Sequence, residues 1–431
     1  MPKVAFHNLG CKVNAYETEA MLQQLQAEGY EIVPFEQEAD VYVINTCTVT
    51  NIADRKSRQM IHRAKRRNPD ALVVAVGCYV QADPEGATAP GGADLIVGND
   101  QKGRLAELIA AHTSSLLDLK APREYEALAL SDSPGHTRAF LKIQDGCNQF
   151  CSYCLIPYVR GRVRSRKPEE VLAEARRLSE KGFCEVVLTG IHLSSYGVDF
   201  SGESGGAENG YGTALRCLIQ KLAEIPGIQR IRLGSLEPRI ITEDFVQALV
   251  SCRKICPHFH LSLQSGCAAT LARMNRKYTP EEYFEKCELL RRSFVHPAIT
   301  TDVIVGFPGE TEEEFRQTRD FLERVSFYEV HVFKYSRRKG TRADRMPDQV
   351  PEPVKAERSR ILLEMTEAQA GQFRAYYFGQ EAEVRLEEPE ERNGETFLTG
   401  YTREYVRVRV PAEGHTSGET VTVTVTEENL A

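Results

Sequence analysis

One ten-residue segment, residues 145–154, constrains this chain more than any other. It carries Cys147, Cys151 and Cys154 in a C-x3-C-x2-C spacing. A loop this short can fold around one inorganic cluster and present three thiolates to it. A four-iron cluster needs four ligands, so three cysteines leave one iron open, as the open position of a catalytic zinc site does. The spacing therefore predicts a [4Fe–4S] cluster that can bind a small molecule.

The same spacing is the signature of the radical-SAM superfamily, which this segment resembles. The resemblance implies that the open iron binds the amino and carboxylate groups of S-adenosylmethionine (SAM) and passes it an electron. The cleaved sulfonium then yields an adenosyl radical, which the protein must position and shield.

Two other interpretations of the three thiols fit less well. Zinc sites usually contain two C-x2-C pairs or add histidines, and this segment offers no fourth local ligand. Disulfides are not expected, because the chain opens without a charged leader and apolar core. These features predict a cytoplasmic protein whose thiols stay reduced. No segment approaches the ~18 apolar residues of a membrane span.

With 431 residues, the chain is predicted to form two or three domains. In the first, residues 1–115, strand-like segments alternate with helical ones, which predicts a parallel α/β domain. The predicted strands are residues 4–9, 41–44 and 72–76, and the predicted helices are residues 17–28 and 54–67.

Cys11, Cys47 and Cys78 each come just after one of these predicted strands. The carboxyl ends of parallel strands line up, and ligands bind in the crevice beyond them. We therefore expect the three cysteines to meet and to hold a second iron–sulfur cluster, again with one free position. The alternative is three buried cysteines that behave as small hydrophobic residues.

The motifs around these cysteines, Gly-Cys-Lys-Val-Asn at 10–14, Asn-Thr-Cys at 45–47 and Val-Gly-Cys at 76–78, resemble the methylthiotransferases. The first motif resembles the branch that acts on N6-threonylcarbamoyladenosine in tRNA. The resemblance covers the whole chain and implies two [4Fe–4S] clusters and SAM as cofactors. It also implies the tRNA anticodon loop, a flavodoxin- or ferredoxin-type electron donor and a sulfur donor as partners.

Residues 116–136 are predicted to be a linker, because they lack periodicity and carry Pro122, Ser131, Ser133, Pro134 and Gly135. Residues 137–370 then contain six strand–helix units. Their number suggests a partial (β/α)6 barrel with its site at the carboxyl ends of the strands. The radical-SAM fold is such a barrel. The predicted strands are residues 139–143, 184–189, 228–233, 259–263, 299–305 and 328–333.

The resemblance also implies contacts to SAM at these strand ends. Thr189 and Gly190 would approach the methionine amino group, Glu237 and Gln264 would contact the adenosyl moiety or order the site, and Arg273 would face the carboxylate. The alternative role for each is to cap a helix or to satisfy a backbone group.

A helix at residues 353–377 precedes the last predicted domain, residues 371–431. There the pattern alternates in period two at residues 381–386, 396–401, 405–410 and 420–425, which predicts a small antiparallel β barrel. It resembles the RNA-binding TRAM domain. However, residues 372–431 hold six arginines and no lysine against twelve glutamates. Such an acidic barrel is a poor general phosphate binder.

Positive charge is concentrated in other segments, although the net charge is −7. Three basic segments around one site predict an RNA-binding surface, whereas a single run of charge is usually a solvated face. The candidate RNA contacts are Arg55, Lys56 and Arg58; Arg160, Arg162, Arg164 and Arg166; Arg337 and Arg338; and Arg407 in the C-terminal domain.

These features together predict a tRNA methylthiotransferase that replaces hydrogen at C2 of the modified adenine by a methylthio group. The same chemistry on isopentenyl-adenosine tRNA or on a ribosomal-protein aspartate is the nearest alternative. A non-catalytic iron–sulfur RNA-binding protein is the alternative of another class. The sequence assigns no oligomeric state.

Overall fold

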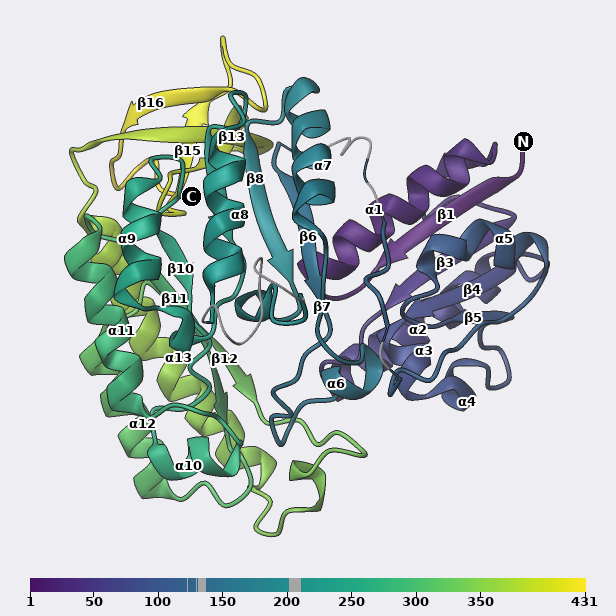
Figure 1. The fold of residues 1–431 in the computed structure, drawn as a ribbon, viewed down its shortest axis with the longest axis horizontal. Coiled ribbons are helices and arrows are strands. Elements are labelled where there is room, and N and C mark those ends of the chain that lie inside the picture. Colours follow the sequence, from purple (N-terminus) through teal and green to yellow (C-terminus); the bar gives the residue numbers. More distant parts are fainter. Residues whose placement is uncertain (122, 129, 131–136, 201–210) are drawn as a thin grey trace.

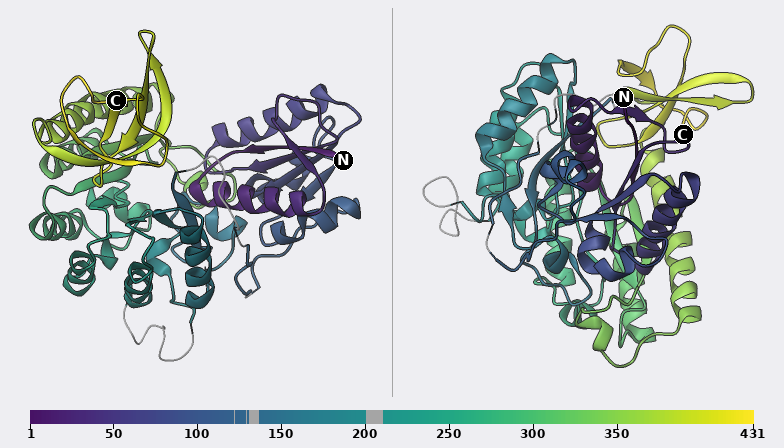
Figure 2. Two further views of the ribbon diagram at one scale, coloured as in Figure 1. Left: turned by 90° about the horizontal axis from the view of Figure 1, so that it is seen from above. Right: turned by 90° about the vertical axis from the view of Figure 1, so that its right-hand side faces the viewer.

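The computed structural model describes residues 1–121, 123–128, 130, 137–200 and 211–431. An N-terminal α/β unit packs beside a larger barrel unit, and a small β unit lies across one end of the barrel (Figures 1 and 2). Most of the predicted linker is described, but Pro122, Ser131, Ser133, Pro134 and Gly135 lie outside the described residues. In the described part of the chain, no helix is both long and apolar enough to cross a membrane.

The N-terminal unit is built on a five-stranded parallel sheet in the order β2-β1-β3-β4-β5. The strands β3 and β4 are buried over almost their whole length, as expected for a sheet covered on both faces. Its strands are β1 (Lys3–Asn8), β2 (Glu31–Val33), β3 (Val41–Thr46), β4 (Leu72–Gly77) and β5 (Leu95–Val97).

Helices cover both faces of this sheet. On one face α1 (Lys12–Ala27) and α5 (Leu105–Ala110) bury Met21, Leu25 and Leu105 against the strands. On the other face lie α2 (Asn51–Arg67), α3 (Cys78–Ala82) and α4 (Pro84–Ala87). The sequence analysis missed the short elements β2, β5, α3, α4 and α5, which are too short to show a clear period.

The barrel unit contains the six predicted strands in the order β6-β8-β9-β10-β11-β12, all parallel where they pair. Single bridges from Ile231 to Ile255 and from Leu236 to Leu261 join β9 to β10. The predicted partial barrel is therefore confirmed. The strands are β6 (Ala139–Asp145), β8 (Glu185–Gly190), β9 (Arg230–Leu233), β10 (His258–His260), β11 (Ala298–Val305) and β12 (Glu329–Lys334).

A short antiparallel strand, β7 (Arg164–Ser165), pairs with the end of β6. The outer face of the barrel is covered by helices that pack one apolar stripe against alternate strand residues. These helices are α7 (Pro168–Glu180), α8 (Thr213–Ala223), α9 (Glu243–Ser251), α11 (Pro280–Ser293) and α12 (Glu312–Val325), with α6 (Ile156–Val159) and α10 (Ala268–Arg273) in loops near the site.

After the long helix α13 (Glu352–Ala375), four antiparallel strands form the C-terminal unit in the order β15-β14-β13-β16. Tyr405 attaches this unit to the barrel, since its ring stacks on His258 of β10 at 4.7 Å and on Tyr401 at 4.4 Å. Tyr405 has a φ of +74°, an uncommon value for a bulky residue. The strands are β13 (Glu381–Arg392), β14 (Glu395–Tyr401), β15 (Arg407–Pro411) and β16 (Thr420–Thr424).

Candidate active site

The three distant cysteines of the N-terminal unit lie together at the carboxyl edge of its sheet. Cys11 caps the start of α1, Cys47 follows β3 and Cys78 opens α3. The strands β1, β3 and β4 that precede them are neighbours. Gly10, with a φ of +114°, lies so close to Cys47 that a Cβ atom there would be 3.1 Å from the Cys47 Sγ. The structure thus places all three cysteines at one edge of the sheet, and their role as cluster ligands stays a prediction.

Asparagine side chains hold the loops of these cysteines in place. The Asn14 Nδ2 donates to the Leu9 carbonyl at 2.7 Å and to the Thr46 carbonyl at 3.0 Å. The Asn45 Nδ2 donates in turn to the Asn14 carbonyl at 3.0 Å. One asparagine thus ties the chain before Cys11 to the residue before Cys47.

The second cysteine set occupies the loop after β6. Gly146 must be glycine there, because its φ is +70° and an added Cβ would lie 1.8 Å from the Arg162 carbonyl oxygen. The Gln144 Nε2 donates to the Asp145 and Gly146 carbonyls at 2.7 Å each. The Cys147 amide donates to the Gly161 carbonyl at 3.1 Å. This tight turn fixes the three thiols relative to the strand.

In each cysteine set, a different arginine donates to one of the sulfurs. The Arg160 Nε lies 3.3 Å from the Cys78 Sγ, and the Arg276 Nη1 lies 3.3 Å from the Cys151 Sγ. A neighbouring cation favours the thiolate, which is the form that binds metal. Both sets thus fit the donor chemistry of an iron–sulfur cluster.

Backbone amides donate to two further sulfurs, from Gln149 to Cys147 and from Ile156 to Cys154, at 3.4 Å each. Burial nevertheless raises the pKa of Cys47 and Cys147 to about 11 and that of Cys154 to about 12. These thiols hold protons without a metal, so cluster binding must displace them.

The spacing of the thiols does not suit a single ion. Thiolates on one tetrahedral zinc ion would be about 4 Å apart. Across the described ranges, only His260, Asp302 and His331 form a group of three ligand atoms that all lie within 4.8 Å of one another. These three come from β10, β11 and β12.

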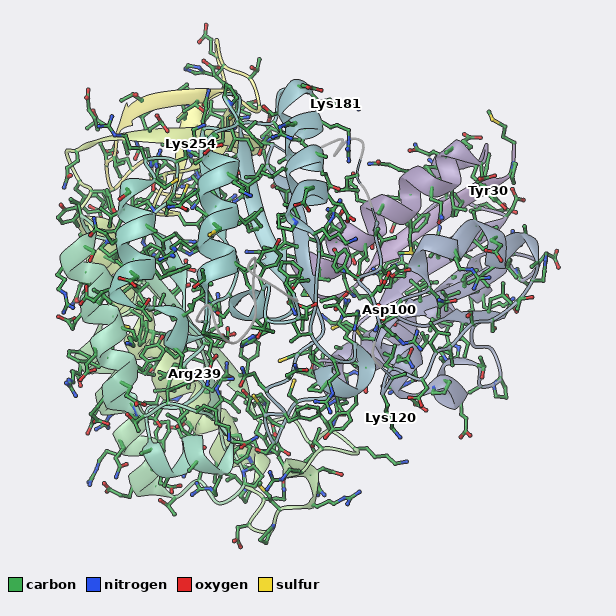
Figure 3. All side chains as sticks on the ribbon, in the orientation of Figure 1. Tyr30, Asp100, Lys120, Lys181, Arg239 and Lys254 are labelled. Atoms are coloured by element: carbon green, nitrogen blue, oxygen red, sulfur yellow. The ribbon has the colours of Figure 1, made fainter. Side chains whose placement is uncertain are left out.

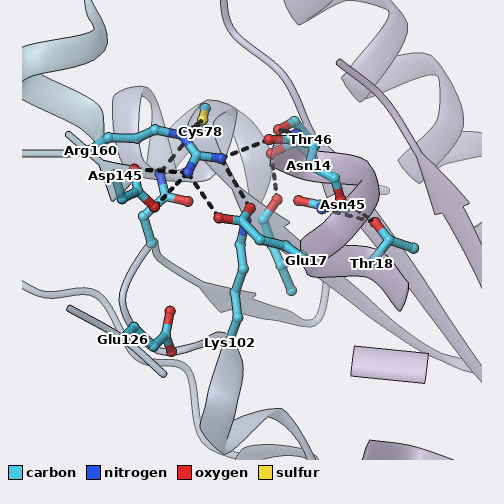
Figure 4. A network of polar contacts seen from close by, with 12 residues as sticks. Asn14, Glu17, Thr18, Asn45, Thr46, Cys78, Lys102, Glu126, Asp145 and Arg160 are labelled. Atoms are coloured by element: carbon cyan, nitrogen blue, oxygen red, sulfur yellow. Dashed lines mark hydrogen bonds and ion pairs between the residues drawn. The ribbon is translucent and has the colours of Figure 1, made fainter. Parts of the chain in front are cut away.

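A buried ionic network connects the two cysteine sets (Figure 4). The Glu17 carboxylate on α1 pairs with the Lys102 Nζ, with the Lys142 Nζ at 2.7 Å and with the Arg160 Nη1 at 2.9 Å. Lys142 and Arg160 also pair with Asp145, at 2.6 and 2.9 Å. Glu17 comes from the N-terminal unit and Asp145 directly precedes the Cys147 loop, so the network fixes one cysteine set relative to the other.

The network also reaches a sulfur of the N-terminal cysteine set. Three cations face two carboxylates, and the Arg160 guanidinium also contacts the Cys78 Sγ. Burial alone would raise the pKa of the Glu17 carboxyl, but the three cations outweigh it and hold this pKa well below its usual range.

Four of the predicted RNA-binding arginines are buried in the protein instead. Arg160 and Arg166 are 1% and 3% exposed, and Arg166 pairs with Glu174 at 2.9 Å. Arg164 pairs with Asp100 at 2.7 Å, at the junction of the two units (Figure 3). Arg338 pairs with Asp54 at 2.7 Å. The prediction of RNA contacts was wrong for these four, because distant carboxylates neutralise them.

The other candidate RNA contacts keep more solvent access. Arg55, Lys56, Arg162 and Arg337 are exposed. Arg58 is half-buried, with its Nη1 3.3 Å from the Tyr79 hydroxyl, and Arg407 lies 3.6 Å from Glu390. Arg338 also donates to the Asn51 Oδ1 at 2.5 Å, so the segment after β12 lies against the start of α2. The structure thus brings two of the three basic segments together.

The residues expected to contact SAM differ in how well their positions agree with that role. Thr189 and Gly190 end β8, and an added Cβ on Gly190 would be 2.9 Å from the Gln144 Oε1. The buried Glu237 accepts from the Arg239 Nε at 2.7 Å and from the Tyr211 hydroxyl at 2.8 Å. Gln264 has a φ of +74°, and such strained backbone clusters at functional sites.

Arg273 does not face the cysteine loop. Its guanidinium pairs with Glu314 at 2.6 Å and donates to the Gly309 carbonyl at 3.2 Å. The arginine at the site is Arg276, which sequence analysis missed. Asn275, with a φ of +60°, ends α10, and the Arg276 amide returns to the Leu271 carbonyl. This glycine-like C-cap turns Arg276 toward Cys151.

Comparison with known proteins places the chain in a family. Residues 3–98 match the model described as "Uncharacterized protein family UPF0004", and residues 141–322 match the radical SAM superfamily. The chain is 43% identical over 415 residues to threonylcarbamoyladenosine tRNA methylthiotransferase MtaB of Bacillus subtilis (strain 168), covering 95% of this chain and 90% of the relative. The chain belongs to the methylthiotransferase family of radical SAM enzymes. Its cofactors are therefore [4Fe–4S] clusters and SAM.

The names of two further relatives give two different tRNA nucleosides. MtaB of Aquifex aeolicus (strain VF5) is 42% identical over 380 residues, which cover 86% of this chain and 89% of the relative. A tRNA-2-methylthio-N(6)-dimethylallyladenosine synthase of Moorella thermoacetica (strain ATCC 39073 / JCM 9320) is 36% identical over 432 residues, covering 97% and 94%.

Among solved structures, the radical SAM methyltransferase TsrM of Kitasatospora setae has the same fold. The TM-score is 0.56 at 14% identity, with 77% of this chain and 73% of that chain covered.

Proposed function

We propose that this enzyme converts N6-threonylcarbamoyladenosine in tRNA to its 2-methylthio derivative. The observation that carries the proposal is the pair of three-cysteine sets joined by the Glu17–Arg160 network, in a chain that matches MtaB relatives over most of its length. In the product, a C2–S bond replaces the C2–H bond of the adenine. One SAM supplies the methyl group, and a second is reduced to methionine and 5′-deoxyadenosine.

Cys147, Cys151 and Cys154 would hold the cluster that binds SAM, and Cys11, Cys47 and Cys78 would hold the auxiliary cluster. When bound, these groups supply the electron that cleaves SAM and the sulfur that enters the product. Arg276 and Arg160 donate to one sulfur of each set and stabilise its negative charge. Thr189, Gly190, Glu237 and Gln264, all at strand ends, would line the SAM position.

For the tRNA we propose a binding surface near the cysteine loop. The Arg162 guanidinium lies 4.6 Å from the centroid of the Phe150 ring, and the neighbouring Tyr158 is 52% exposed. Unstacked RNA bases pack on such aromatic and guanidinium groups. Arg55 and Lys56 on α2 and Arg337 after β12 would contact phosphates. The anticodon loop would bind here, and a tRNA substrate would place the enzyme in the cytoplasm.

Two partners complete the proposal. A flavodoxin- or ferredoxin-type protein would reduce the cluster that binds SAM, and a separate sulfur donor would restore the sulfur consumed in each product. The C-terminal unit would assist tRNA binding as a TRAM-like domain, but through few residues, because Arg407 and Arg409 already face Glu390.

A second candidate substrate is dimethylallyl-adenosine in tRNA, which the name of the Moorella relative gives. The deciding measurement is mass spectrometry of tRNA nucleosides from cells with and without the gene. Loss of the 2-methylthio-threonylcarbamoyl nucleoside with retention of its precursor supports the proposal. Loss of the dimethylallyl product instead supports the second candidate.

The roles of the two cysteine sets are tested separately. Cys151→Ala should abolish reductive SAM cleavage. Cys47→Ala should retain SAM cleavage but give no methylthiolated product. Full product from either variant contradicts the assignment, and a wild-type protein that cannot cleave SAM would point to a non-catalytic RNA-binding role.

A further inference from the structure

Lys12 extends from the first turn of α1 toward the inner face of the barrel. It directly follows Cys11 and lies one helical turn before Tyr16, so the two side chains share one face of α1. Tyr16 packs in one cluster with Phe140 of β6. Phe140 is on the inner face of its strand, because Ala139 and Leu141 pack against the outer helices. The face of α1 that carries Lys12 therefore lies against the barrel interior.

The inner face of the barrel near its amino-terminal end is rich in arginine, but these charges are balanced. Each arginine pairs with a glutamate, and Arg230 also lies 3.6 Å from the carboxylate of Glu185. The pairs are Arg138 with Glu387 at 2.8 Å, Arg230 with Glu383 at 2.7 Å and Arg232 with Glu185 at 2.6 Å. Three cations therefore meet three carboxylates, and this group has no anion to spare for a further cation.

Lys12 is the additional cation beside this group. Within the ranges that the structure describes, no ion pair includes it. Arg138 and Arg232 are the cations whose charges act on it. The side chain still keeps access to solvent. A positive charge held near other cations, accessible and without a carboxylate, favours an incoming anion.

We propose that Lys12 binds the carboxylate of the threonylcarbamoyl group and thereby selects the substrate. This inference rests on the proposed function, in which that group is the only anionic part of the modified base. Lys12 directly follows Cys11, so a base whose substituent reaches Lys12 would lie beside the auxiliary cysteines. A dimethylallyl substituent has no charge and would gain nothing from this contact.

Two other anions are less suitable occupants. The carboxylate of SAM would bind near Cys147, at the carboxyl ends of the strands. Arg138 directly precedes β6, so its side chain lies at the opposite end of that strand. An RNA phosphate remains as the competing occupant, and the test below separates it from the carboxylate.

The test measures binding of fluorescent anticodon stem-loop RNAs to the reconstituted full-length enzyme. Three RNAs differ only in the base beside the anticodon: threonylcarbamoyladenosine, its neutral methyl amide, and unmodified adenosine. The wild type should bind the acid about 10- to 100-fold more tightly than the amide, which is the range for a charge-assisted hydrogen bond. Lys12→Met should bind both alike, and Lys12→Arg should keep the preference.

Lys221→Met, a change of an exposed lysine on the outer helix α8, is the matched control and should behave as the wild type. The unfolding temperature of each variant is measured to check its fold. A wild type that prefers the acid and a Lys12→Met variant that keeps this preference would overturn the inference. So would an equal loss of affinity for unmodified RNA, which would indicate a phosphate contact. A wild type that does not distinguish the modified from the unmodified RNA would instead contradict the proposed function.

Discussion

Glu17→Gln tests whether the buried network holds the two cysteine sets together. The change keeps the shape of the side chain but removes the charge that faces Lys102, Lys142 and Arg160, all within 3.0 Å. Removing one partner of a buried ion pair costs about 3–5 kcal/mol, because the remaining charges stay desolvated. Local opening of α1 and β6 should therefore become about 100- to several-thousand-fold more frequent.

Hydrogen–deuterium exchange of peptides from α1 and β6 measures this opening directly. It avoids a single unfolding free energy, which is poorly defined for a chain with several domains. The matched control is Glu107→Gln on α5, where the glutamate pairs with Arg104 at the surface and should give no measurable change. Similar exchange in the two variants would refute the role given to the network.

The pH dependence of this effect has a definite sign. The folded state holds the pKa of Glu17 well below the ordinary value of 4.5, so its contribution to stability is complete above that value. As the pH falls below 4.5 toward the folded-state pKa, the contribution is lost, and the wild type should approach the exchange behaviour of Glu17→Gln. The double variant Glu17→Gln/Lys102→Met removes one cation together with the carboxylate. It should therefore recover part of the protection of α1 and β6 against hydrogen–deuterium exchange.

Three other predictions follow from single contacts. Gly146→Ala should lower the iron content by about half, because its Cβ would collide with a backbone carbonyl in the loop of one of the two predicted clusters. The matched control Gly182→Ala also changes a glycine with positive φ (+92°), but nothing lies within 4 Å of the added Cβ, so its iron content should not fall. Equal iron in both variants would contradict this prediction. Tyr405→Ala removes two ring stacks, each worth about 0.5–1.5 kcal/mol, and should make limited proteolysis of the C-terminal unit faster. Arg55→Ala with Lys56→Ala should weaken stem-loop binding and reduce its salt slope by about one per residue; an unchanged slope would exclude α2 from the RNA surface.

The sequence alone was sufficient for the local parts of the site. The spacing of Cys147, Cys151 and Cys154 limits those thiols to one short loop, whatever the rest of the chain does. Cys11, Cys47 and Cys78 could be placed as well, because the alternation of strands and helices predicts a parallel sheet whose carboxyl ends line up. Both inferences depend on covalent spacing or on secondary structure, which a linear pattern contains.

The roles of the arginines were decided only by the tertiary structure. Arg160 lies in a basic segment that resembles a solvated or RNA-binding face, yet its partner Glu17 is 143 residues away in the chain. Arg273 and Arg276 are three residues apart, and the left-handed conformation of Asn275 determines which of them reaches Cys151. A charge becomes structural when the fold brings a distant carboxylate to it and excludes water. The sequence determined which residues carry charge, and only the packing of distant segments decided which charges are neutralised and which, like that of Lys12, remain available to a ligand.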